Sequence, residues 1–209
     1  MNSKVEIMGV LNITDNSFYD GGKFNSLKAS FDHAKKLIND GADIIDIGAE
    51  SSKPGSNPVS SKDQIRKIEP LVEALRDISN IPISIDTRSS KVISHLLKYE
   101  INIVNDISSL EDKDLLDIIK SHRLSISLMH MLGTPKTMQT NPIYDNVVDD
   151  IYGYLKNRAE LCINHGIDKS NIIIDPGFGF GKTLDHNYEI LNNLEKFSKM
   201  GYRVLSGIS

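Results

Sequence analysis

The sequence predicts an α/β protein built from parallel βα units, and two patterns predict it. Short apolar runs rich in β-branched residues recur along the chain, and amphipathic stretches with helical spacing separate them. The apolar runs are nearly continuous rather than alternating, which is typical of parallel strands buried on both faces. The expected strands cover residues 7–11, 44–47, 83–85, 101–104, 125–129, 172–174 and 204–205.

Six helical stretches lie between these strands. The first carries an apolar stripe from Leu27 to Ile38 and reaches Gly41 where a C-terminal cap belongs. The second runs from about Ile65 to Leu75, and Pro70 inside it predicts a kink or a break. The other four are expected near residues 92–97, 115–119, 144–165 (with Gly166 as a stop signal) and 185–198.

Two folds fit this alternation, an open doubly wound sheet and a (β/α)8 barrel. Seven repeats without a sign of reversed strand order favour the barrel. A complete barrel takes about 250 residues, whereas this chain of 209 residues reaches only its seventh strand. We therefore predict an incomplete (β/α)8 TIM barrel with about seven strands and six to seven helices, in which the last βα unit is missing. No linker divides the chain, so residues 1–209 are expected to form a single domain.

Composition excludes several classes of function. The formal net charge is −4 and no run of Lys and Arg is present, so we expect no nucleic-acid partner. No apolar run approaches the roughly 20 residues of a membrane span, and residues 1–12 lack the apolar core of a signal peptide. The single cysteine, Cys162, fits a reducing compartment and a buried apolar role. The sequence thus predicts a cytoplasmic protein with no membrane partner.

Polar residues follow the strands, at the ends where βα barrels build their active sites. Asp86 follows the third strand, Asn105 the fourth and Asp175 the sixth. Burying such groups costs a few kcal/mol unless something hydrogen-bonds to them. A ligand ring with amino, amide and ring N–H donors would satisfy all three. For any one of them, pairing with another polar group or with the backbone is the alternative.

The glycine-rich run DPGFGFGKT, residues 175–183, invites comparison with a nucleotide-binding P-loop. Its spacing argues against that function, because Pro176 occupies the position where a Walker motif needs Gly. The histidines show no paired metal-ligand spacing, although His130 at a strand end could touch a ligand. No Gly-x-Ser-x-Gly elbow is present and Cys162 has no evident partner, which leaves covalent catalysis unsupported.

Six segments resemble the successive signatures of dihydropteroate synthases. They are MGVLNITDNSFYDGG (8–22), GADIIDIGAESSKPG (41–55), SIDTR (84–88), NDI (105–107), MHMLGTPKTMQ (129–139) and DPGFGFGKT (175–183). They occur in family order and at family spacing, and the first, second and sixth are highly specific. The resemblance implies a (β/α)8 barrel that condenses 6-hydroxymethyl-7,8-dihydropterin diphosphate with p-aminobenzoate in folate biosynthesis, releases diphosphate and uses Mg²⁺.

The same resemblance assigns a pterin side to the site. It implies that Asp86, Asn105 and Asp175 hold the pterin ring, and that Met129 and Phe180 pack near the faces of the ring. Carboxylates around an electron-rich dihydropterin would favour positive charge at its reacting carbon, so the carboxylates at positions 86 and 175 are expected to act in catalysis.

The resemblance also assigns a diphosphate and p-aminobenzoate side. Asn12 would contact Mg²⁺ or the diphosphate, and Ser52 matches a family Thr whose hydroxyl touches the diphosphate. Phe18, Lys53 and Pro54 match positions that line the p-aminobenzoate pocket, where sulfonamide drugs would bind. The substrate-binding set also includes Ser51 and Gly207, and the catalytic set also includes Lys53.

Three departures from the family pattern qualify these expectations. Asn16 replaces a loop carboxylate, and Lys53 replaces a family Arg, which exchanges a planar fork for a point charge. The family pattern also continues after Gly-x-Ser (here 207–209) with Arg-Lys and a basic eighth strand. We therefore expect the isolated 209-residue chain to be inactive. The resemblance itself implies that the full-length protein is a homodimer. A pterin-binding methyltransferase domain and a non-catalytic pterin-binding relic are the alternatives.

Overall fold

A computed structural model describes residues 5–13, 23–53 and 55–208. The chain divides into two compact units. The first comprises Met1–Ser51 and Pro58–Ile103, and the second comprises Ser52–Asn57 and Val104–Ser209. The single domain expected over residues 1–209 stays a prediction.

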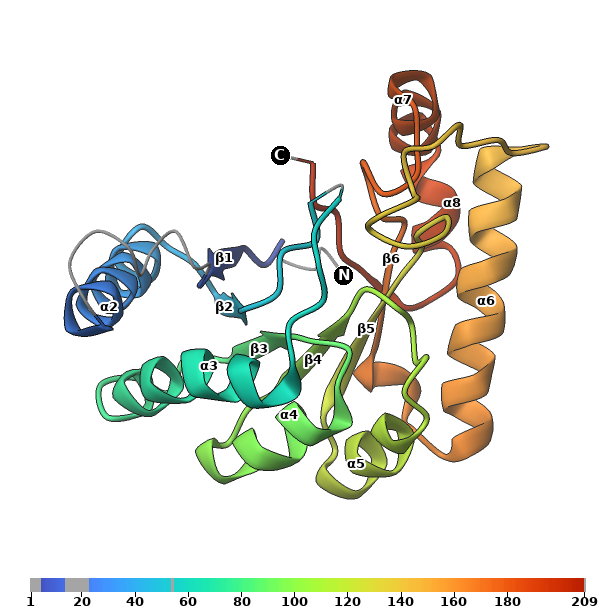
Figure 1. Ribbon diagram of the computed structural model, residues 1–209. Helices are drawn as coiled ribbons and strands as arrows, with labels where there is room; N and C mark the ends of the chain where they lie inside the picture. The colour runs from blue at the N-terminus through green and yellow to red at the C-terminus, as the bar shows by residue number, and fades with distance from the viewer. Residues whose placement is uncertain (1–4, 14–22, 54, 209) are drawn as a thin grey trace. The chain divides into compact units, whose positions relative to one another are not determined.

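The first unit contains three parallel strands, with helices that follow them (Figure 1). Its strands are β1 (Met8–Asn12), β2 (Ile44–Gly48) and β3 (Ile83–Asp86), and its helices are α2 (Lys23–Asn39), α3 (Ser61–Arg76), α4 (Ser90–Leu96) and the 3₁₀ turn Leu97–Tyr99. β1 pairs with β2, and β2 with β3. The register sets Asn12 beside Gly48 and Gly48 beside Asp86, so the three strands end level with one another.

The second unit repeats this arrangement with the later strands. It contains β4 (Ile103–Asp106, beginning at the boundary), β5 (Ser125–Met129), β6 (Ile172–Asp175), β7 (Arg203–Val204), α5 (Asp114–His122), α6 (Val147–His165), the 3₁₀ turn Lys169–Asn171, α7 (Leu184–Asn192) and α8 (Leu194–Ser198). Its strands follow one another in chain order, and the pairs β5–β6 and β6–β7 are parallel. The long helix α6, orange in Figure 1, packs against β5 and β6.

The strands are buried as the continuous apolar runs predict. Every residue of β2 and of β6 is buried, and full burial of each isoleucine side chain stabilises the fold by about 1.5–3 kcal/mol. Cys162 is buried in α6 as expected, and burial raises the pKa of its thiol to about 11. None of the helices in the described part of the chain has the length and apolar character needed to cross a membrane.

The structure narrows one helix prediction and corrects another. α3 runs through Pro70 without the break that the proline allows, because the ring is exposed while Ile68, Leu71 and Leu75 on the same helix are fully buried. Water can then reach the carbonyl that proline leaves without its helical N–H donor. The helix expected at 185–198 is instead two helices, α7 and α8, separated at Asn193, whose φ of −111° leaves the helical range.

Candidate active site

Two predicted site residues meet at the end of the three strands in the first unit. A methyl group added at Gly48 would lie 3.0 Å from Asp86 Oδ2 and 3.1 Å from Asn12 Oδ1. Both polar side chains therefore lie over the backbone of Gly48. Asp86 is half-buried and Asn12 is exposed. Gly48 is a site residue that the sequence analysis missed, and its signal was a glycine ending a buried strand between two polar strand ends.

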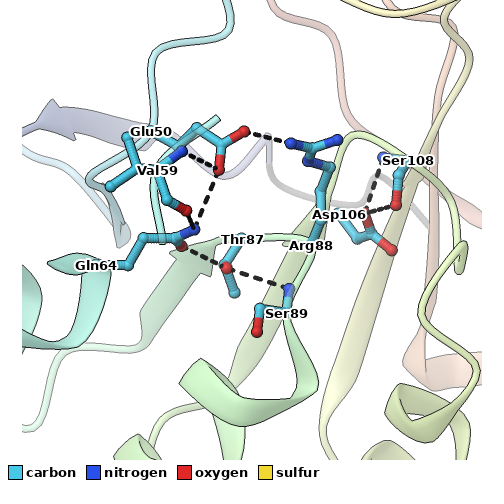
Figure 2. A network of polar contacts seen from close by, with 8 residues as sticks. All are labelled: Glu50, Val59, Gln64, Thr87, Arg88, Ser89, Asp106 and Ser108. Atoms are coloured by element: carbon cyan, nitrogen blue, oxygen red, sulfur yellow. Dashed lines mark hydrogen bonds and ion pairs between the residues drawn. The ribbon is translucent and has the colours of Figure 1, made fainter. Parts of the chain in front are cut away.

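A polar network fixes the chain just beyond β2 and β3 (Figure 2). Glu50 forms an ion pair with Arg88, and its Oε2 accepts a hydrogen bond from Gln64 Nε2 at 3.1 Å. The hydroxyl of Thr87 donates to Gln64 Oε1 at 2.7 Å. Since Thr87 directly follows Asp86, the network holds the segment after β2 against the residues that follow the predicted pterin-binding carboxylate.

The residues predicted to contact the diphosphate and p-aminobenzoate are only partly described. Ser51 and Ser52 are half-buried and Lys53 is exposed, whereas Phe18 and Pro54 lie outside the described residues. In the second unit, the N–H of Gly55 donates to the carbonyl of Pro135 at 3.0 Å. This bond joins the residues after Lys53 to the loop that follows β5.

Asn105 lies one residue before the end of β4 and is half-buried, and Asp106, which ends the strand, holds the turn that follows. The fully buried Asp106 carboxylate accepts hydrogen bonds from the N–H and hydroxyl of Ser108, at 2.8 Å and 2.6 Å, and from Leu110 N–H at 2.7 Å. Ser109 Oγ donates to Met129 O at 2.7 Å, which ties this turn to the end of β5. Asp106 therefore stabilises the backbone beside Asn105.

Asp175 and Met129 lie side by side at the ends of β6 and β5. Asp175 is only 8% exposed, and its Oδ1 accepts a hydrogen bond from Gly177 N–H at 2.7 Å. Burial raises the pKa of this carboxyl to about 6, against the opposing effects of the Gly177 N–H and of the nearby Lys182 ammonium. A buried carboxyl with a raised pKa at a strand end is typical of a functional site.

Lys182 is the second site residue that the sequence analysis missed. Its ammonium is buried, and Nζ donates to His130 Nδ1 at 3.1 Å, His130 O at 3.1 Å and Phe180 O at 3.0 Å. Burial lowers the pKa of Lys182 to about 7, while Asp175 opposes this effect. Burial, followed by the Lys182 charge, lowers the pKa of His130 to about 3, so the imidazole is neutral and accepts a hydrogen bond through Nδ1.

The glycine-rich segment after β6 is held by the loop after β5. Gln139 Nε2 donates to Gly179 O at 2.6 Å, and Tyr144 Oη donates to Gly181 O at 2.7 Å. The half-buried Phe180 lies between these two anchored glycines in sequence. Gly207, beyond β7, is exposed. The structure thus brings together Asn12 with Asp86 in one unit and Met129 with Asp175 in the other.

Comparison with known proteins identifies the family. Residues 8–209 match the model of a family described as pterin binding enzyme. This chain belongs to the pterin binding enzyme family. It is 41% identical over 204 residues to a dihydropteroate synthase of Haemophilus influenzae, and 42% identical over 207 residues to that of Escherichia coli. These alignments cover 98% and 99% of the chain, and 74% and 73% of the relatives.

Solved structures agree with the sequence relatives. A Yersinia pestis dihydropteroate synthase in complex with a sulfonamide drug matches with a TM-score of 0.90 and 39% identity, covering 98% of this chain and 74% of the other. A Xanthomonas albilineans dihydropteroate synthase in complex with 7,8-dihydropteroate matches with a TM-score of 0.86 and 33% identity, covering 98% and 72%. The predicted incomplete (β/α)8 barrel and the resemblance to dihydropteroate synthases are confirmed.

Proposed function

We propose that this chain carries out the chemistry of a dihydropteroate synthase, a transferase of folate biosynthesis. It would join 6-hydroxymethyl-7,8-dihydropterin diphosphate to p-aminobenzoate. The observation that carries the proposal is the set of polar residues ending its strands, in a chain 42% identical to the Escherichia coli enzyme over 99% of its length. Asn12 and Asp86 end β1 and β3, while Asn105 and Asp175 lie at the ends of β4 and β6.

The buried polar groups suit a pterin. Its ring presents N–H and amino donors beside a carbonyl acceptor. Asp175 supplies an acceptor at the end of β6, and Asp86 and Asn105 add an acceptor and an amide. Hydrogen bonds from the ring to these oxygen atoms would offset part of the free-energy cost of burying the polar groups. Met129 and Phe180 are proposed to pack near the ring faces.

The reaction requires no protein nucleophile. The C–O bond between the pterin methylene carbon and the diphosphate breaks, a C–N bond to the aniline nitrogen forms, and that nitrogen loses a proton. Ionisation of the C–O bond leaves positive charge on the dihydropterin, which the carboxylates of Asp86 and Asp175 stabilise electrostatically. Diphosphate leaves with the bonding electron pair.

Mg²⁺ is proposed as the cofactor. Among the described residues no group of three or more His, Cys, Asp and Glu side chains could hold a metal. The exposed Asn12 offers a hard amide oxygen at the end of β1. Mg²⁺ commonly takes few protein ligands, with substrate phosphates and water completing its coordination, so Asn12 fits this role. When bound, the ion neutralises charge on the leaving diphosphate. Asn12→Ala should raise the Mg²⁺ concentration that gives half-maximal rate.

Phe18, Lys53 and Pro54 would line the p-aminobenzoate pocket, Ser52 would contact the diphosphate, and Ser51 and Gly207 complete the proposed substrate-binding set. Lys53 places a cation within a segment that must bind an anionic carboxylate, and sulfonamide drugs would compete there. A homodimer through the outer helices and a cytoplasmic location are parts of the same proposal.

The test is dihydropteroate formation by the native polypeptide purified from its source. Wild-type protein should turn over both substrates, and Asp86→Asn and Asp175→Asn should each lower kcat by about 100-fold or more. Asp117→Asn is the matched control, since Asp117 lies on the surface of α5 paired with His165. Unchanged turnover in both site variants would refute the ionisation pathway. Methyl transfer from a methylated folate, in place of dihydropteroate formation, would favour the methyltransferase alternative.

A further inference from the structure

We propose that Gln64 is a positioning residue that holds together Glu50 and Val59, the two residues that flank the p-aminobenzoate segment, residues 51–58. The inference rests on the proposed function and adds to it a residue that lies outside the predicted substrate contacts. Gln64 sits in the first turn of α3 and is only 3% exposed. A buried amide in a helix is costly unless its donors and acceptor are used.

Both N–H donors and the oxygen of the Gln64 side chain bond to neighbouring residues (Figure 2). Its Nε2 donates to Glu50 Oε2 at 3.1 Å and to Val59 O at 2.9 Å. Its Oε1 accepts from Thr87 Oγ1 at 2.7 Å. Two N–H donors therefore meet two acceptors while the oxygen meets a hydroxyl, which determines the orientation of the amide.

Two of these partners bracket the p-aminobenzoate segment. Glu50 directly precedes residues 51–58 and Val59 directly follows them. Gln64 bonds to both, and Val59 N–H adds a long contact to Glu50 Oε2 at 3.5 Å. One amide thus closes the two ends of the segment. Closing the ends in advance reduces the conformational entropy that ordering the segment around a ligand would cost.

The third partner links the segment to the pterin side. Thr87 directly follows Asp86, and its Oγ1 also accepts from Ser89 N–H at 3.3 Å. Arg88, the next residue, pairs with Glu50. Gln64 therefore joins the ends of the p-aminobenzoate segment to the residues directly after β3. Because Arg88 retains Glu50 when Gln64 is lost, the expected consequence is a loosened segment rather than an unpaired buried charge.

The decisive experiment separates the two substrates. In the native polypeptide, Gln64→Leu should raise KM for p-aminobenzoate about tenfold, while KM for the pterin diphosphate and kcat change less than about threefold. Ser61→Ala is the matched control. Ser61 lies at the start of the same helix and its hydroxyl lies 2.9 Å from Ser89 Oγ, but it is not a bonding partner of Glu50 or Val59 in this network. This variant should leave both KM values unchanged.

A second pair of variants tests the hydrogen bond between the Thr87 hydroxyl and the Gln64 amide oxygen. Thr87→Val removes the hydroxyl that orients the Gln64 amide and should raise KM for p-aminobenzoate about threefold, whereas Thr87→Ser should restore it. This pair also decides the question should Gln64→Leu fail to fold.

Three results would overturn the inference: an unchanged KM for p-aminobenzoate in Gln64→Leu, an equal rise in both KM values, or a Thr87→Ser variant that behaves like Thr87→Val. Absence of turnover in the wild-type protein would instead contradict the proposed function itself.

Discussion

The strand ends of the two units carry similar residues in different physical settings. At the ends of β1–β3, the half-buried Asp86 lies with Asn12 over the backbone of Gly48. At the ends of β5 and β6, Asp175 is 8% exposed and Lys182 is 4% exposed. The first region is built from side chains that can shift, and the second from close backbone contacts and buried charges that cannot. Substitutions should therefore affect mainly activity in the first region, and both stability and pH dependence in the second.

Gly177→Ala should have the largest effect. Gly177 has φ +69°, and a methyl group there would lie 2.1 Å from the carbonyl oxygen of His130. That contact involves backbone on both sides, so relief requires displacing the end of β5. We expect a loss of at least about 3 kcal/mol in the free energy of unfolding, measured by urea denaturation.

Gly179→Ala is the control that separates the effect of the close contact with His130 from the effect of a positive φ. Gly179 has a similar φ of +79°, but a methyl group there would have no neighbour within 4 Å. It should cost only about 1–2 kcal/mol, the penalty for a left-handed alanine. If both variants lost the same stability, the close approach to His130 would carry no weight and the second region would be no more rigid than the first.

Asp175→Asn should remove a pH dependence of the free energy of unfolding that the buried Asp175 carboxyl causes in the wild-type protein. Burial raises the pKa of Asp175 from 3.8 to about 6 in the folded protein. The protonated carboxyl is therefore favoured by folding, and that contribution is present below the unfolded pKa and lost as the pH rises through about 6. Relative to wild type, Asp175→Asn should gain up to about 3 kcal/mol in the free energy of unfolding between pH 4 and pH 7.

The measurement is urea denaturation of both proteins across that pH range. Lys182 acts in the opposite sense, because burial lowers its pKa to about 7 and its contribution is lost as the pH falls through that value. The difference between wild type and Asp175→Asn below about pH 6 therefore reports mainly on the carboxyl. A difference that stays constant with pH would contradict the buried-charge account.

The sequence predicts the fold and the strand-end residues well, for a physical reason. Parallel strands buried on both faces leave continuous apolar runs, so a polar residue ending a run stands out, as Asp86, Asn105 and Asp175 do. Helix boundaries were harder to predict. Pro70 predicts a kink or a break, but α3 continues through it because its neighbours Ile68 and Leu71 are fully buried.

The residues that were missed depend on partners distant in sequence. In the sequence, Lys182 is the lysine of a glycine-rich run whose spacing does not fit a P-loop, and only the structure shows its ammonium bonded to His130. Gln64 is one polar residue of an amphipathic helix, and only the structure shows its amide bonded to Glu50 and Thr87. The reason for a glycine at position 48 becomes clear only when Asn12 and Asp86, at the ends of the two neighbouring strands, are seen to lie over its backbone. Periodicity encodes which face of an element is buried, but not which side chains meet there.

Gly48→Ala should affect activity more than stability. The added methyl group would meet Asp86 Oδ2 at 3.0 Å and Asn12 Oδ1 at 3.1 Å, and both are side-chain atoms that can move by a few tenths of an ångström. We expect less than about 1 kcal/mol of lost stability and a fall of about tenfold in kcat/KM, because the displaced groups are those proposed to hold substrate and Mg²⁺.

Gly153→Ala in α6 is the control for Gly48→Ala. A methyl group at Gly153 would meet no atom within 4 Å, and alanine in a helix interior should stabilise by up to about 1 kcal/mol without changing activity. If Gly48→Ala destabilised the protein as much as Gly177→Ala, the contrast between the adjustable and the rigid region would be lost.

Tyr144→Phe should have the smallest effect, although it removes a 2.7 Å hydrogen bond to the Gly181 carbonyl beside Lys182. Phenylalanine keeps the ring contacts with His186 and His130, at 5.0 Å and 5.9 Å between ring centroids. The turn is also held by the Gln139 bond to Gly179 O. Loss of one hydroxyl should therefore cost about 1 kcal/mol of stability and change kcat less than about twofold.

Tyr154→Phe provides the matched control for that last substitution. Tyr154 packs edge-on against the same His130 ring at 5.0 Å, whereas the hydroxyl that bonds to Gly181 O belongs to Tyr144. It should leave both stability and kcat unchanged. A tenfold or larger fall in kcat for Tyr144→Phe alone would show that a single hydroxyl sets the position of Lys182. Activity would then depend on a single side chain in the second region as much as in the first. The rigidity of the second region would come from that hydrogen bond rather than from backbone packing.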